Sequence, residues 1–230
     1  LEAGWDVIAL SRRRPETGST REFRHISVDL RDADATRADL GDLRGVGQLF
    51  YAALYEQPGL VPGWSDREQM TTNLLMLTNT VESLAGAGLD NVVLLQGTKA
   101  YGVHLMPLRI PAKERQPRVV HENFYWLQED YLKGRAPEIG CSYTILRPQF
   151  IFGGVVGAAM NLVPIIGLYG ALCREQGLPF SYPGGSSYVA EASDPRLIAD
   201  AALWASESPA AANETFNITN GDVFEWRDVW

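Results

Sequence analysis

Two short tracts carry the residue types from which hydride chemistry could be built. Lys99 lies in Gln96-Gly97-Thr98-Lys99-Ala100-Tyr101-Gly102, directly after the apolar run 92–95, and so at the carboxyl end of an expected strand. Open α/β sheets bind their ligands at this edge. Tyr125, in Asn123-Phe124-Tyr125, opens an expected helix and could bring a phenol to the same edge. An ammonium and a phenol that face a nicotinamide suit a reaction in which negative charge develops on a substrate oxygen.

Apolar runs typical of strands alternate along the chain with helical patterns. This alternation implies right-handed crossovers between parallel strands, so the sequence predicts an α/β fold with a doubly wound parallel sheet. We expect a dinucleotide-binding core over residues 1–152 and, over 153–230, mixed substrate-pocket segments with one returning strand. The expected strands are 6–10, 25–28, 48–51, 92–95, 142–146 and 215–218, and the clearest expected helices are 65–87 and 124–136.

Composition and charge exclude several classes of protein. A chain of 230 residues with a formal net charge of −8 does not suit a nucleic-acid surface. Two cysteines, Cys141 and Cys173, suggest core thiols and a reducing cytoplasm, and three scattered histidines offer no metal-ligand spacing. Residues 149–173 carry no charge, but their glycines and Pro164 argue against a membrane span.

Basic residues directly after the first expected strand indicate the cofactor. Ser11, Arg12 and Arg13 follow that strand, where an acidic residue would select NAD and arginines favour the 2′-phosphate of NADP. We therefore expect NADPH, with a solvated basic turn as the alternative. Asp29 and Leu30 could contact the adenine, although Asp29 could equally cap a helix. Ala52 is small enough to let the backbone approach the cofactor.

The turn that should bind the pyrophosphate is not in this sequence. A Gly-x-x-Gly-x-x-Gly turn belongs after a strand that would precede residues 6–10. The chain instead opens on Leu1-Glu2-Ala3-Gly4, which looks like the end of a helix, and closes just after the start of another element. We expect the chain to be truncated at both ends.

At these residues the chain resembles the short-chain dehydrogenase/reductase superfamily, whose core is a Rossmann fold. More narrowly, it resembles the progesterone 5β-reductase and iridoid synthase-like enone reductases and their bacterial relatives. The resemblance covers nearly the whole chain. Besides the tracts above, it rests on Arg147-Pro148-Gln149-Phe150-Ile151-Phe152-Gly153, Pro179-Phe180-Ser181-Tyr182-Pro183-Gly184 and Phe216-Asn217-Ile218-Thr219-Asn220-Gly221-Asp222.

The resemblance assigns the catalytic pair. Ordinary superfamily members carry Tyr-x-x-x-Lys on one helix, but Glu129 stands four residues after Tyr125, and Tyr131 with Arg135 is a near miss that we discount. In the enone-reductase branch the lysine comes from the strand-end loop, which matches Lys99. The resemblance therefore implies that Tyr125 and Lys99 are catalytic and that Lys99 also holds the nicotinamide ribose.

The resemblance also indicates which residues meet the nicotinamide and the substrate. The backbone of Pro148, Gln149, Phe150 and Ile151 should lie beside the nicotinamide. Trp126 is the second aromatic residue that the branch carries, while Leu54 stands near the position of a tryptophan in plant members, which leaves the substrate open. The residues that we expect around the substrate are Leu54, Tyr101, Trp126, Met160 and Phe180, of which Tyr101 also suits a packing role.

The expected activity is NADPH-dependent reduction of the C=C bond of an activated enone, a small-molecule substrate. Hydride adds to the β-carbon, and Tyr125 donates a hydrogen bond to the enolate oxygen, with Lys99 expected to lower the phenol pKa. Three alternatives stay open: a carbonyl reductase, an enzyme of the NAD-dependent epimerase/dehydratase type, and a non-catalytic NADPH-binding sensor. The sequence leaves the oligomeric state open, with a homodimer as one option.

Overall fold

The computed structural model describes residues 1–58, 62–154 and 161–230, which fall into two compact units. The first unit consists of Leu1–Val92 and His121–Tyr143, and the second of Val93–Val120 and Thr144–Trp230. This division does not coincide with the boundary expected between residues 152 and 153, which stays a prediction about function.

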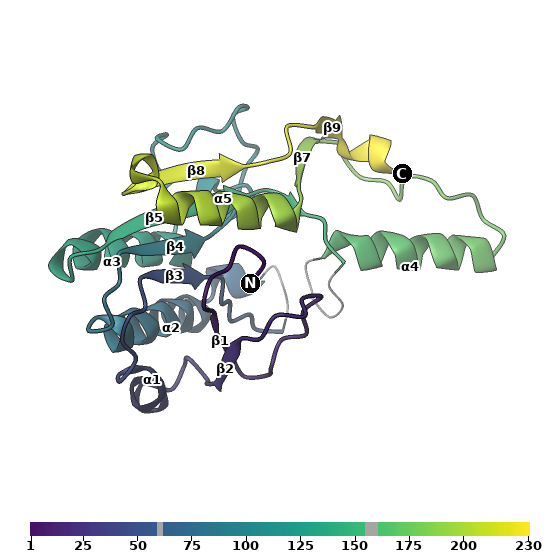
Figure 1. The fold of residues 1–230 in the computed structure, drawn as a ribbon. Coiled ribbons are helices and arrows are strands. Elements are labelled where there is room, and N and C mark those ends of the chain that lie inside the picture. The colour runs from purple at the N-terminus through teal and green to yellow at the C-terminus, as the bar shows by residue number, and fades with distance from the viewer. Residues whose placement is uncertain (59–61, 155–160) are drawn as a thin grey trace. The chain divides into compact units, whose positions relative to one another are not determined.

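The protein has an α/β fold with a parallel sheet, as the sequence predicts, and Figure 1 labels its elements. The main sheet has the strand order β3-β4-β5-β8. Helices and strands alternate through most of the chain. Their bounds are β1 Ile8–Ser11, β2 Arg24–Ser27, α1 Ala33–Leu40, β3 Gln48–Tyr51, α2 Arg67–Leu84, β4 Asn91–Leu95, α3 Phe124–Glu138, β5 Ser142–Pro148, β6 Phe150–Ile151, α4 Leu162–Glu175, β7 Val189–Ser193, α5 Pro195–Glu207, β8 Glu214–Ile218 and β9 Val223–Glu225, with short 3₁₀ helices η1 Pro62–Ser65, η2 Thr98–Tyr101, η3 Pro209–Ala211 and η4 Trp226–Val229.

In the first unit, β1 and β2 form a ribbon of their own. They lie side by side and pair in parallel, with Ile8 opposite Arg24 and Ser11 opposite Ser27 (Figure 1). Within the described residues β1 pairs with no other strand, and β3 stands at the edge of the main sheet. The two strands that should border the nucleotide therefore each keep one free edge.

Two helices of the first unit are tied together by polar side chains. Asp66 caps α2 by accepting a hydrogen bond from the Gln69 backbone N–H over 2.8 Å. Gln128 of α3 donates through Nε2 to the Asn73 carbonyl oxygen of α2 over 3.1 Å. Tyr131 and Arg135, the near miss of the sequence, both bind Glu82 of α2. These contacts give Tyr131 and Arg135 a structural role.

The second unit is built on the parallel pair β5 and β8, with α5 packed along β8 (Figure 1). Its core contains Val93, Leu146 and Ala211, which are buried together with two alanines of α5. A smaller sheet follows, in which β6 pairs in parallel with β7 and β7 pairs in antiparallel fashion with β9. β7 and β9 belong to the region that the sequence assigns to the substrate pocket, whereas β6 holds Phe150 and Ile151, which are expected beside the nicotinamide.

Candidate functional site

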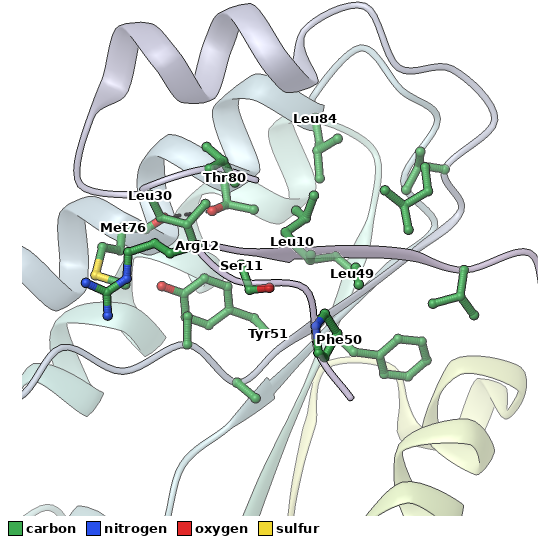
Figure 2. A pocket seen from close by; sticks show the side chains of 18 of the residues that line it. Leu10, Ser11, Arg12, Leu30, Leu49, Phe50, Tyr51, Met76, Thr80 and Leu84 are labelled. Carbon is green, nitrogen blue, oxygen red and sulfur yellow. Dashed lines mark hydrogen bonds between the residues drawn. The ribbon is translucent and has the colours of Figure 1, made fainter. Parts of the chain in front are cut away.

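A cavity of about 630 Å³ lies in the first unit, between the free edges of β1 and β3. Figure 2 shows its walls, with Leu10 and Ser11 from β1 and Leu49 to Tyr51 from β3. The cavity gathers residues that the sequence assigns to the cofactor from three separate tracts. The predicted residues that line it are Ser11, Arg12, Asp29, Leu30, Ala52 and, from the expected substrate pocket, Leu54.

The turn after β1 is held by β2. Ser11 Oγ lies 2.5 Å from the Arg13 carbonyl oxygen and 3.2 Å from His25 Nε2, and Ser27 Oγ donates to the Arg12 carbonyl oxygen over 3.1 Å. Arg14 is already engaged, because its guanidinium stacks over the Phe23 ring at 4.4 Å. The backbone that carries Arg12 and Arg13 is thus fixed.

Unlike Arg14, whose guanidinium stacks on Phe23, Arg12 and Arg13 have guanidinium groups that are open to a ligand. Both residues are exposed, and among the described residues neither guanidinium has a hydrogen-bond partner. Arg12 lines the cavity, whereas Arg13 is not among the lining residues. Two planar cations at the end of a strand could bind a phosphate monoester with several hydrogen bonds.

Asp29 does not cap a helix, because the N-cap of α1 is Asp32, which accepts from the Ala35 N–H over 2.9 Å. Asp29 instead binds Arg31, with Arg31 Nε 2.9 Å from Oδ1. The hydrogen bonds from Arg31 lower the pKa of the Asp29 carboxyl to about 2. The carboxylate is therefore ionised at neutral pH and keeps acceptor capacity for an adenine amino group.

Arg31 and Tyr55 are lining residues that the sequence reasoning gave no role. The Arg31 guanidinium lies 5.5 Å from the centre of the Tyr55 ring, and both residues border the cavity. A flat cation and an aromatic ring offer stacking surfaces for a purine. The sequence feature that could have indicated Arg31 is its position two residues after Asp29, just past the end of a strand.

The cavity is lined by apolar side chains together with a few polar ones, two of which carry buried atoms without a hydrogen-bond partner among the described residues. Leu10, Leu49 and Leu84 line it, from β1, β3 and α2. Tyr51 is buried, which raises the pKa of its phenol. Tyr51 Oη and Gln48 Oε1 are both buried and have no hydrogen-bond partner among the described residues. Such buried polar atoms normally have a hydrogen-bond partner.

Tyr125 lies in the first turn of α3, whose N-cap is Asn123. Asn123 Oδ1 accepts from the Tyr125 backbone N–H over 3.0 Å. The Tyr125 ring packs edge-on against Trp64 at 5.3 Å and against Phe124 at 4.6 Å. Burial raises the pKa of the Tyr125 phenol, and the charge of Glu56 raises it further. The expected lowering of this pKa by Lys99 depends on a residue of the other unit and stays a prediction.

Lys99 lies in the second unit, in η2 after β4. The Gln96 N–H donates to the Leu146 carbonyl oxygen over 2.8 Å, which joins the end of β4 to β5. Gly102 closes η2 in the left-handed region with φ of +82°, and its N–H donates to the Lys99 carbonyl oxygen over 3.1 Å. Lys99 and Tyr125 belong to different units, so their meeting at one nicotinamide stays a prediction.

Part of the backbone expected beside the nicotinamide already forms hydrogen bonds to β7. The Gln149 N–H donates to Ser193 Oγ over 3.2 Å, and Phe150 and Ile151 pair with β7. Pro148 ends β5 opposite Ile218. Gln149 Oε1 is buried without a hydrogen-bond partner among the described residues. That carbonyl oxygen, which the sequence did not single out, suits an amide donor.

The other residues expected around the substrate differ in their burial and contacts. Tyr101 is buried, with Arg147 4.8 Å from its ring centre and its hydroxyl donating to Asn217 Oδ1 over 2.6 Å, as a packing role requires. Trp126 is buried against His121, with ring centres 4.5 Å apart. Phe180 is exposed on one side and packs on Tyr169 and Trp230. Met160 lies outside the described residues. Contact of these residues with a substrate stays a prediction.

Other kinds of site are not found in the described part of the chain. Residues 1–58, 62–154 and 161–230 contain no cluster of three potential metal ligands. Within those same ranges no helix has the length and apolar character needed to cross a membrane. Cys141 and Cys173 are buried free thiols, in agreement with the expected core role.

The chain is similar to two curated plant enzymes. It is 33% identical over 245 residues to the 3-oxo-Δ(4,5)-steroid 5-β-reductase of Arabidopsis thaliana, a match that covers 98% of this chain and 60% of that protein. It is 31% identical over 240 residues to the (S)-8-oxocitronellyl enol synthase of Camptotheca acuminata, again covering 98% of this chain and 60% of that protein. The chain thus spans about 60% of the length of these relatives. No family model matches the sequence.

Among solved structures, the chain is similar to the UDP-glucose 4-epimerase of Thermus thermophilus in complex with NAD. The TM-score is 0.74 at 20% sequence identity, and the match covers 99% of this chain and 74% of that one. At this level of identity the likeness concerns the fold alone, and it agrees with the α/β architecture described above.

Proposed function

Because the chain belongs to the progesterone 5β-reductase-like family of short-chain dehydrogenases/reductases, we propose that the whole protein reduces the C=C bond of an activated enone with NADPH. The observation that carries this proposal is the cavity that gathers Ser11, Arg12, Asp29, Leu30 and Ala52 from three tracts. Its rim fits the adenosine half of a dinucleotide, with cations for a phosphate and an ionised carboxylate for the adenine amino group.

The residues of the rim, and Arg13 beside it, each have a defined task in this proposal. Arg12 and Arg13 bind the 2′-phosphate through their exposed guanidinium groups, on a backbone that Ser27 holds in place. Asp29 accepts from the adenine amino group while Arg31 fixes its orientation. Asn79 of α2 donates to the Leu30 carbonyl oxygen over 2.8 Å, which holds the loop that carries Asp29.

Tyr125 is the proposed donor to the developing enolate. When bound, the reduced nicotinamide supplies a hydride to the β-carbon of the enone. Charge then accumulates on the carbonyl oxygen, and the neutral Tyr125 phenol donates a hydrogen bond to it. The resulting enolate takes a proton from solvent at its α-carbon, which gives the saturated ketone. A donor aimed at an oxyanion contributes about 3–4 kcal/mol to the transition state. In the proposal Lys99 adds positive charge at the same oxygen and holds the ribose.

The test uses the full-length protein and 2-cyclohexen-1-one. We expect NADPH-dependent formation of cyclohexanone, with kcat reduced roughly 10²–10³-fold by Tyr125→Phe, because that variant lacks the donor and retains the ring. Lys99→Ala should lose activity and Lys99→Arg should retain part of it. Formation of the allylic alcohol in place of the saturated ketone would replace the proposal with a carbonyl reductase.

A further inference from the structure

A buried oxygen of Glu56 lies in the first unit, which also contains the proposed donor Tyr125. Glu56 Oε1 is buried and has no hydrogen-bond partner among the described residues. Glu56 stands in the loop that follows β3, and it is not one of the residues that line the cavity described above. A buried carboxylate oxygen without a donor is costly, because it has lost the hydrogen bonds that water would make to it. Neither the fold nor the proposed mechanism gives this carboxylate a role.

The loop that carries Glu56 is fixed by buried polar side chains of α2. Asn73 Oδ1 accepts from the Tyr55 backbone N–H over 2.9 Å, and Asn73 Nδ2 donates to the Tyr55 carbonyl oxygen over 2.8 Å. The Gln57 N–H donates to Gln69 Oε1 over 2.8 Å. Both Asn73 and Gln69 are almost fully buried. Because the backbone is held on both sides of Glu56, the carboxylate has a defined place.

The same glutamine connects this loop to the ring that packs on Tyr125. Gly63 lies so close to Gln69 Oε1 that a Cβ added to this glycine would stand 2.5 Å from that oxygen. Trp64, the next residue, has its ring centre 5.3 Å from that of Tyr125. The charge of Glu56 is near enough to raise the pKa of the Tyr125 phenol. The carboxylate and the phenol thus lie in one part of the first unit.

The charge of Glu56 sets a requirement on the substrate. In the proposed reaction, negative charge develops on the carbonyl oxygen to which Tyr125 donates. A carboxylate close to that oxygen repels the developing charge. A hydroxyl group that donates to Glu56 weakens this repulsion and supplies the missing partner of Oε1. An enone that carries such a hydroxyl meets both needs, whereas an unsubstituted enone meets neither.

We propose that Glu56 is a substrate-binding residue and that the substrate is an enone with a hydroxyl group beside its carbonyl. Glu56 accepts a hydrogen bond from that hydroxyl while Tyr125 donates to the carbonyl oxygen. The inference rests on the proposed function, since it places the substrate at Tyr125. It narrows the substrate from activated enones in general to hydroxylated ones.

Two enones that differ by a single oxygen atom test this role. The full-length protein and NADPH are given 2-(hydroxymethyl)-2-cyclohexen-1-one or 2-methyl-2-cyclohexen-1-one, and formation of the saturated ketone is measured. The hydroxyl of the first compound lies next to the carbonyl oxygen, and the second compound lacks it. We expect kcat/KM to favour the hydroxymethyl compound roughly 10- to 100-fold, because it makes one more hydrogen bond to a charged group.

Variants of Glu56 separate the carboxylate from the intrinsic reactivity of the two enones. Glu56→Leu has no acceptor, so it should reduce the ratio of the two kcat/KM values roughly tenfold or more. Glu56→Gln keeps an acceptor of the same size without the charge, so its ratio should lie between the other two. Glu122→Leu changes an exposed carboxylate just before the N-cap of α3 and should leave the ratio at the wild-type value. Circular dichroism checks that all three variants are folded.

Binding without turnover distinguishes this inference from the proposed function. The saturated ketones 2-(hydroxymethyl)cyclohexanone and 2-methylcyclohexanone are titrated calorimetrically into the protein with NADP+, and the same preference and its loss in Glu56→Leu are expected. If neither enone is reduced, the proposed function fails, and the calorimetric ratio then decides on Glu56. A ratio that Glu56→Leu and Glu56→Gln leave unchanged in both measurements would overturn the inference, with a water molecule as the partner of Oε1.

Discussion

The Arg31 guanidinium donates hydrogen bonds to the Asp29 carboxylate from two nitrogens. Nε lies 2.9 Å from Oδ1 and Nη2 lies 2.5 Å from Oδ2. The two residues lie in the loop that follows β2, and both border the cavity. Arg31 fixes the one carboxylate that the proposal places beside the adenine. The same pair also makes the stability of the fold depend on pH.

The first prediction concerns acid stability. The pKa of Asp29 is about 2 in the folded chain, below the value of about 4 in an unfolded chain. Because the folded value is lower, the contribution is present above pH 4 and is lost as the pH falls towards 2. Asp29→Asn should therefore cost stability at pH 6 and clearly less at pH 2.5. The cost should stay under about 1 kcal/mol, because the pair is more than a third exposed.

Urea denaturation at both pH values measures this difference. Asp42→Asn is the matched control, since Asp42 is exposed and has no hydrogen-bond partner among the described residues. The same loss of stability for Asp29→Asn at pH 6 and pH 2.5 would contradict the assignment of the pair.

The second prediction concerns the choice of cofactor by the full-length protein. Arg12→Ala with Arg13→Ala should weaken NADPH binding roughly 10- to 100-fold and NADH binding far less, because charged hydrogen bonds to the 2′-phosphate are lost. Arg14→Ala is the control: Arg14 carries the same charge but stacks on Phe23. Calorimetric titration with both cofactors measures the ratio. Equal loss for NADPH and NADH would remove the 2′-phosphate role.

The third prediction concerns Glu56, whose charge raises the pKa of Tyr125. Glu56→Gln removes that charge, so the phenol should ionise at a lower pH and cease to donate earlier. The alkaline limb of kcat/KM should therefore move to lower pH in this variant of the full-length protein. Glu122→Gln, at an exposed position before Asn123, serves as the control. An alkaline limb that Glu56→Gln leaves unmoved would show that Tyr125 does not titrate with activity.

The fourth prediction separates the two tyrosines of α3. The Tyr131 hydroxyl donates to Glu82 Oε1 over 2.8 Å, and Arg135 binds the same carboxylate. Tyr131→Phe should lower the free energy of unfolding by about 1 kcal/mol, since it removes one hydrogen bond, and should leave kcat unchanged. Tyr125→Phe should instead lower kcat. Steady-state kinetics and urea denaturation of both variants measure these effects. A loss of kcat in Tyr131→Phe would instead support Tyr131 with Arg135 as the catalytic pair.

The sequence predicted the strands that are bounded by turn residues and filled with apolar side chains. Residues 48–51 form β3 with the expected limits, and α2 and α3 lie largely within their expected ranges. The helix α4 was harder to place because Pro164 and Gly167 look like breakers. Pro164 falls in the first turn, where a missing N–H costs no helical hydrogen bond.

The site was predictable only in part. Strand ends directed attention to Ser11, Arg12 and Asp29, and the cavity does gather them. The sequence could not separate Asp29 from Asp32 as the helix cap, because both suit that position. The raised pKa of Tyr125 could not be predicted from the sequence either, since the packing of Trp64 and the charge of Glu56 come from distant parts of the chain.

Deuterium transfer tests the central claim most directly. The full-length protein is given 2-cyclohexen-1-one with NADPH that carries deuterium at the transferred position of the nicotinamide, and the product is analysed by mass spectrometry and NMR. Enone reduction at Tyr125 and Lys99 predicts cyclohexanone with deuterium at the β-carbon, and loss of that product in Tyr125→Phe and Lys99→Ala. Deuterium on the carbonyl carbon of an allylic alcohol, or an undiminished product in those variants, would contradict it.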